Sequence, residues 1–188
     1  MWLRREFSGL TLNFDIPKNH FQLFGLTPVY LLDTDKLELE FRALQAQVHP
    51  DKSAHLADTE QRLAMQRSTL VNEAYQTLRS PIRRARYLLS LKGVDTQEET
   101  NTAMPVDFLM AQMEWREAVE DALKARDISA LEKLEARMKI DTRALEAGLA
   151  VKIDVEQDYP AAAGLVRKLR FMEKLAEEID SAYDEIDL

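Results

Sequence analysis

The chain contains no cysteine, which excludes disulfide bonds and thiolate-bound metal sites. Its three histidines, His20, His49 and His55, lack the spacing of metal ligands, so we expect no metal and no cofactor. Glycine and proline are scarce, with five and six among 188 residues, and no strand-like alternation persists. No apolar run approaches the roughly 20 residues that a membrane-spanning helix needs. These absences favour a helical protein that does not act on a membrane.

The composition allows a buried core, because 46% of the residues are hydrophobic. Charge is unevenly spread: residues 19–94 hold 10 Lys/Arg and 8 Asp/Glu, whereas residues 95–188 hold 12 and 23. The acidic second half disfavours a nucleic acid or an anionic membrane as its partner. This asymmetry fits two modules with separate partners, although two unrelated solvated surfaces would give the same charges.

Apolar periodicity, N-cap residues and turn residues together predict a series of helices. We expect them over residues 19–25, 34–48, 58–79, 82–92, 105–126, from 127 to about 149, and from about 158 to near the C-terminus. The predicted fold is therefore all-α. It comprises an N-terminal extension (1–18), a helical module (19–94), a polar linker (95–104) and a three-helix bundle (105–188).

The tripeptide His49-Pro50-Asp51, followed by Lys52, lies between the second and third predicted helices. By itself it could be an ordinary turn in which Pro50 ends one helix and Asp51 caps the next. The layout of helix, HPD loop and helix, however, resembles a J-domain, the module that stimulates the ATPase of DnaK-type chaperones. The flanking segments 19–28 and 71–79 resemble the first and third helices of such a domain.

The predicted helix 105–126 has two apolar faces. One face suffices to pack in a three-helix bundle and comprises Phe108, Ala111, Trp115, Ala118, Val119 and Ala122. The opposite face carries Val106, Leu109, Met110 and Met113, with Glu114, Glu117 and Asp121 at its border. An exposed apolar patch with a charged border is typical of a protein contact, and methionine adapts well to a partner. The alternative is that the helical module 19–94 covers this second face as core.

The last predicted helix offers a companion to that patch. Its expected core line is Leu165, Leu169, Met172, Ala176, Ile179 and Tyr183. Phe171 lies about 100° from the centre of this line on a helical wheel, beside a basic strip of Arg167, Arg170 and Lys174. Phe171 and Arg170 could extend the patch, or Phe171 could fill the edge of the core.

Taken together, residues 19–188 resemble the HscB family of iron–sulfur cluster co-chaperones. The resemblance rests on the segments 21–26, 49–52, 77–81, 86–91, 108–110 and 166–171. It implies a J-domain that contacts the DnaK-type chaperone HscA and a C-terminal bundle that binds the scaffold protein IscU. No nucleic acid and no membrane are expected as partners.

The resemblance also implies two sets of binding residues. The chaperone-binding set is His49, Pro50, Asp51, Lys52, Arg42 and Lys36. The scaffold-binding set is Leu109, Met110, Met113, Glu114, Glu117, Asp121, Arg170 and Phe171. The chain departs from the family pattern at Val48, where an aromatic residue often stands, and at Asp121, where Glu is usual. Glu38 and Glu40 make the second helix less basic than in general J-proteins.

Two other functions are compatible with parts of the sequence. The first is a general J-protein that serves unfolded clients. The second is an enzyme that uses His49 and Asp51 as an acid–base pair, but the sequence places no further base or nucleophile beside them. We expect a cytoplasmic protein. Arg4, Arg5 and Ser8 hint at a mitochondrial transit peptide, but the acidic residues of the extension argue against one.

Overall fold

The computed structural model describes residues 19–48, 57–98 and 104–187, in which every regular element is helical. The elements are α1 (His20–Leu23), α2 (Thr34–Val48), α3 (Asp58–Arg79), α4 (Pro81–Leu91), α5 (Val106–Lys124), α6 (Ile128–Ala150), the π-helical turn η2 (Val151–Val155) and α7 (Tyr159–Asp187). The all-α prediction is confirmed. The predicted extension 1–18 lies outside the described residues.

Local capping sets where several helices begin. The side chains of Asn19, Asp33, Ser80, Asp127 and Asp158 each accept a hydrogen bond from the backbone N–H three residues later. These bonds satisfy amides that a first helical turn leaves without a partner. The starts of α1, α2, α4, α6 and α7 therefore follow from the sequence, as predicted.

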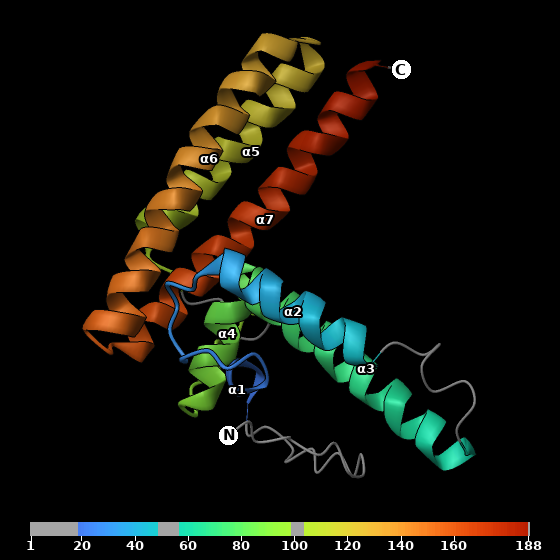
Figure 1. Cartoon of the computed structure of the whole chain (residues 1–188). Helices are drawn as coiled ribbons and strands as arrows, with labels where there is room; N and C mark the ends of the chain where they lie inside the picture. Colours follow the sequence, from blue (N-terminus) through green and yellow to red (C-terminus); the bar gives the residue numbers. More distant parts are fainter. Residues whose placement is uncertain (1–18, 49–56, 99–103, 188) are drawn as a thin grey trace, which may run out of the picture.

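Helices α1 to α4 form the module that resembles a J-domain, and we refer to it as the J-domain. Within it, α2 and α3 make an antiparallel hairpin that projects away from the rest of the molecule (Figure 1). The rings of Phe41 on α2 and Tyr75 on α3 stack with centroids 3.9 Å apart. Leu37 and Leu78 are fully buried, and Phe21 of α1 is buried in the same core. These apolar contacts hold the hairpin together.

Helices α5, α6 and α7 form the three-helix bundle, whose core is made by the predicted face of α5 and two long partner helices. Trp115, Leu131, Leu175 and Ile179 are buried there, and the Arg137 guanidinium lies 4.5 Å from the centroid of the Trp115 ring. The predicted core line of α7 is partly wrong, because Leu175 is fully buried whereas Leu165 is only half-buried.

The J-domain and the base of the bundle share one hydrophobic core. Helix α4 packs on α7, and buried J-domain residues such as Leu89 belong to the same cluster as Leu149, Ile153 and Val166 from α6, η2 and α7. The carboxylate of Asp154 on η2 also accepts hydrogen bonds from the backbone N–H groups of Tyr30 (2.7 Å) and Leu31 (2.9 Å). Apolar packing and these polar contacts together fix the angle between the hairpin and the bundle.

Candidate protein-binding site

The second apolar face of α5 is open to solvent. Val106, Leu109, Met110 and Met113 are between 40% and 72% exposed, whereas Trp115 on the opposite face is 4% exposed. The alternative in which the J-domain covers this face as core is therefore wrong. We call the four exposed residues the α5 patch. Covering water-exposed apolar side chains with a partner lowers the free energy of the system. The α5 patch is therefore a candidate protein-binding surface.

Acidic side chains follow the α5 patch along the same helix. Glu114, Glu117 and Asp121 are exposed, and none forms an ion pair with another described residue. The next acid, Glu120, is instead paired with Lys124 at 2.8 Å. Three unpaired carboxylates beside an apolar surface favour a partner with cations at its border.

Phe171 is not part of the open surface. It is 6% exposed and lies in the bundle core, where its ring meets that of Phe108 edge to face with centroids 5.6 Å apart. The Arg116 guanidinium lies 5.7 Å from the same ring. The prediction that Phe171 extends the exposed patch is therefore wrong. The ring instead packs in the bundle core against Phe108, which lies in the first turn of α5 and is only partly buried.

Phe171 nevertheless lines a hollow of about 230 Å³ between α5 and α7. Leu109 and Arg170 line the same hollow, so the structure brings together one residue of the α5 patch and two of the predicted residues from α7. Arg170 is held by Glu173, with Nη1 3.0 Å from Oε2. The hollow offers both apolar and charged lining to a partner side chain, since Leu109, Phe171 and Arg170 all border it.

The predicted chaperone-binding residues are only partly described. His49, Pro50, Asp51 and Lys52 lie outside the described residues. Lys36 and Arg42 are exposed on α2, and Arg42 forms an ion pair with Glu38 one turn earlier. Helix α2 ends at Val48, and its C-terminal end points away from the bundle (Figure 1).

Comparison with known proteins identifies the family. Residues 104–180 match the family model described as "HSCB C-terminal oligomerisation domain". A protein of an Azoarcus species named "Co-chaperone protein HscB homolog" is 49% identical over 173 residues, which cover 92% of this chain and 98% of that protein. The chain belongs to the HscB family of co-chaperones. Other relatives, from Aromatoleum aromaticum and Chromobacterium violaceum, carry the same name and are 47% and 51% identical over 94% and 93% of this chain.

Solved HscB structures have the same architecture. Chaperone HscB from Vibrio cholerae is 39% identical, with a TM-score of 0.82 over 88% of this chain and 98% of its own. Human co-chaperone HscB is 30% identical, with a TM-score of 0.83 over 88% of this chain and 82% of its own. The arrangement of a J-domain and a helical bundle in this HscB-family chain is thus that of its relatives.

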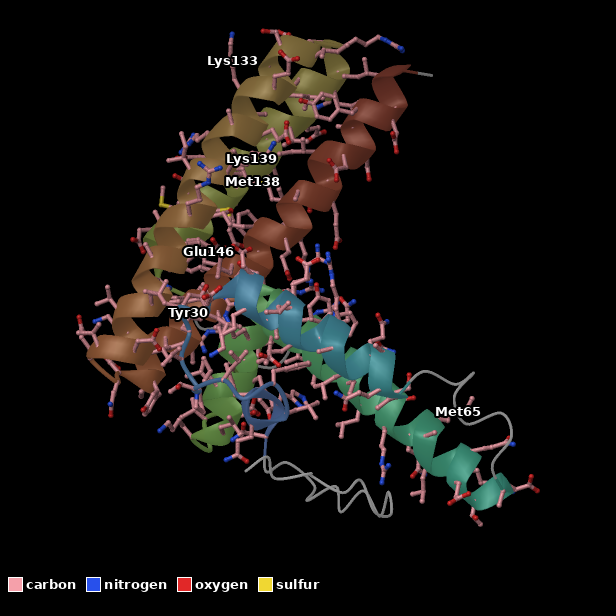
Figure 2. All side chains as sticks on the ribbon, viewed as in Figure 1. Tyr30, Met65, Lys133, Met138, Lys139 and Glu146 are labelled. Carbon is pink, nitrogen blue, oxygen red and sulfur yellow. The ribbon has the colours of Figure 1, made fainter. Side chains whose placement is uncertain are left out.

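Sequence reasoning missed a polar cluster at the junction of the two parts of this HscB-family chain. Arg84 on α4 is 7% exposed, donates to the carbonyl oxygen of Leu78 at 2.6 Å, and lies 5.1 Å from the centroid of the Tyr30 ring. Glu146 on α6 lies close to Tyr30 at the same junction (Figure 2). One signal was available: Arg84 precedes the buried Leu88 by four residues, which places both on one face of the helix.

Burial changes the protonation equilibria in this cluster. It lowers the pKa of the Arg84 guanidinium and raises the pKa of the Glu146 carboxyl, because both charged forms lose water. It also raises the pKa of the Tyr30 hydroxyl, with the nearby Glu146 charge as the second cause. The cluster is thus a structural junction between the J-domain and the bundle rather than part of the α5 patch.

No helix in the described part of the HscB-family chain combines the length and the apolar character of a membrane span. Nor do three histidine, aspartate or glutamate side chains converge there in a group that would hold a metal ion.

Proposed function

We propose that this protein is an adaptor in iron–sulfur cluster assembly that binds two proteins at once. Its J-domain stimulates the ATPase of the DnaK-type chaperone HscA. Its bundle binds the cluster scaffold IscU through the α5 patch, the acidic border and Arg170. The observation that carries the proposal is the exposed apolar face of α5 in a member of the HscB family.

The arrangement of the molecule supports two simultaneous contacts. The free end of the α2–α3 hairpin and the α5 patch belong to different arms of the structure (Figure 1). The shared core and the Asp154 contacts hold these arms at a fixed angle. A rigid adaptor raises the effective concentration of the scaffold at the chaperone, which favours transfer without any new contact between the two.

The scaffold-binding role is tested by removing apolar atoms from the patch. We expect Leu109→Ala combined with Met113→Ala to weaken binding of the scaffold by about 2–4 kcal/mol, as for clustered hot-spot residues. Isothermal titration calorimetry measures this loss. The matched control is Ile140→Ala, which removes an equally exposed apolar side chain (66% exposed) from α6. The proposal fails if the double variant binds the scaffold as tightly as the control.

The chaperone-binding role is tested at the HPD motif. We expect His49→Gln to abolish stimulation of the HscA ATPase while the melting temperature and the affinity for the scaffold stay unchanged. Steady-state ATP hydrolysis measures the first, and circular dichroism and calorimetry the others. Full stimulation by a folded His49→Gln protein would contradict the proposal. Running the same assay with a general DnaK-type chaperone separates the proposed function from that of a general J-protein.

A further inference from the structure

A polar cleft of about 910 Å³ adjoins the hollow at Leu109 and Phe171. It lies between α4 of the J-domain, residues 95–98 and α7. Glu98, Arg170 and Lys174 line both cavities, so the two form a continuous depression. The cleft therefore extends the candidate site from the bundle across to the J-domain.

The cleft is basic in a part of the molecule that is otherwise acidic. Four cations line it, namely Arg83, Arg86, Arg170 and Lys174, against two carboxylates, Asp95 and Glu98. The unpaired acids of α5 follow the α5 patch along that helix, and they do not line the cleft. The candidate surface thus combines apolar side chains with an acidic border on α5 and a separate basic cleft.

Two of the four cations are occupied within the protein. Arg86 is held by Glu98, which accepts from its Nε at 2.6 Å and from a second guanidinium nitrogen, and which also accepts from the Thr96 hydroxyl at 2.6 Å. Arg170 is held by Glu173. These pairs hold the Arg86 and Arg170 guanidinium groups in place and partly neutralise their charge.

The other two cations are available to a partner. The side chains of Arg83 on α4 and Lys174 on α7 are exposed, and neither pairs with another side chain in the described part of the protein. They reach the cleft from different arms of the structure. A carboxylate-bearing chain laid along the cleft could pair with both, because no carboxylate among the described residues forms an ion pair with either of them.

The geometry points to an acidic segment of the scaffold protein as the occupant of this cleft. The inference rests on the proposed function and deepens it, since the same partner covers the α5 patch and continues into the cleft. The charge of the cleft is complementary to that segment, and the shared lining residues make it continuous with the patch. The scaffold thereby contacts both the bundle and α4 of the J-domain, which fixes its orientation toward the chaperone.

Charge reversal with kinetic measurement tests the inference. We expect Arg83→Glu and Lys174→Glu each to slow association of the scaffold about tenfold at low ionic strength, with a smaller effect at high ionic strength, because rim charges act mainly on the association rate. Glutamate at position 83 fits the fold, since Ser80 caps α4 and Glu three residues later completes a capping box.

The matched control is Lys133→Glu, which makes the same charge change near the N-terminal end of α6, away from the J-domain (Figure 2). We expect it to change the association rate less than twofold. If Arg83→Glu and Lys174→Glu behave as Lys133→Glu does, the inference is overturned. If the Leu109 and Met113 double variant binds normally as well, the proposed function fails too; if that variant is impaired, only the cleft inference fails.

The lack of cysteine permits a second, direct test. Arg83→Cys introduces the only thiol of the chain, to which a benzophenone photocrosslinker is attached. After irradiation of the complex, mass spectrometry is expected to find crosslinks to an Asp/Glu-rich segment of the scaffold, and none from Lys133→Cys. Absence of crosslinks from position 83, or crosslinks to a segment without acidic residues, would overturn the inference.

Discussion

The carboxylate of Asp154 is expected to hold the J-domain against the bundle, and Asp154→Ala tests this. The variant loses two hydrogen bonds, from the Tyr30 N–H at 2.7 Å and from the Leu31 N–H at 2.9 Å. Hydrogen bonds to a charged group each stabilise by about 1.5–3 kcal/mol. The Leu31 bond is solvent-exposed, so water replaces part of it, whereas Tyr30 is buried. We therefore expect a loss of about 3 kcal/mol in the free energy of unfolding.

This loss translates into a measurable melting shift. For a chain of this size, each kcal/mol lowers the melting temperature by about 2–4 °C, which gives a fall of about 6–12 °C. Thermal unfolding followed by circular dichroism measures it. Asp154→Asn keeps one acceptor oxygen and is expected to lose about half as much.

The control for the Asp154→Ala variant is Glu156→Ala, which changes a carboxylate two residues further along the chain. Glu156 is exposed and pairs only with Lys152 at 2.5 Å, an interaction worth less than about 1 kcal/mol. If the melting temperatures of the Asp154→Ala and Glu156→Ala proteins differ by less than about 2 °C, the two backbone hydrogen bonds do not stabilise the junction and the reasoning is refuted.

Two more predictions concern a buried residue, Phe171, and a half-buried one, Glu146. Phe171→Ala should lower the free energy of unfolding by about 3–5 kcal/mol, because it empties a packed position in the bundle core. Urea denaturation measures this loss. A loss below about 1 kcal/mol would show that the ring is a surface residue. Burial raises the pKa of Glu146 above its ordinary 4.5, so the native state binds this proton more tightly than the unfolded chain does, and stability falls as the pH rises from about 4.5 through the raised value. Glu146→Gln should remove that fall. The free energy of unfolding of the variant, relative to that of the parent protein, should therefore rise with pH from about 4.5 to the raised pKa and stay constant at higher pH. If the free energies of unfolding of the two proteins change in parallel with pH, the prediction is contradicted.

The sequence predicted those features that depend on neighbours within one or two turns. Helix starts followed from caps such as Asp33 and Asp127, whose partners lie three residues away. The α5 patch followed from a 3.6-residue period that leaves more apolar surface than one bundle face needs. Both are local patterns, so no knowledge of the tertiary structure was required.

What the sequence did not reveal depends on contacts between distant segments. Helix α7 packs against α4 near its N-terminal end and against α5 and α6 further along, so its buried face changes partners and a single core line misses Leu175. The three arginines of α4, at 83, 84 and 86, look alike in the sequence. Only the fold shows that Arg84 is buried, that Arg86 is paired with Glu98 and that Arg83 forms no ion pair with another described residue.

Because the J-domain shares its core with the base of the bundle, it cannot be transferred to another protein without losing part of its packing. Leu149, Ile153 and Val166, contributed by later parts of the chain, complete the packing around Leu89. A fragment ending near residue 94 would expose an apolar surface where those side chains had packed. Grafting it onto an unrelated protein would therefore require redesign of the face of α4 that meets α7, and natural recombination of this J-domain faces the same obstacle.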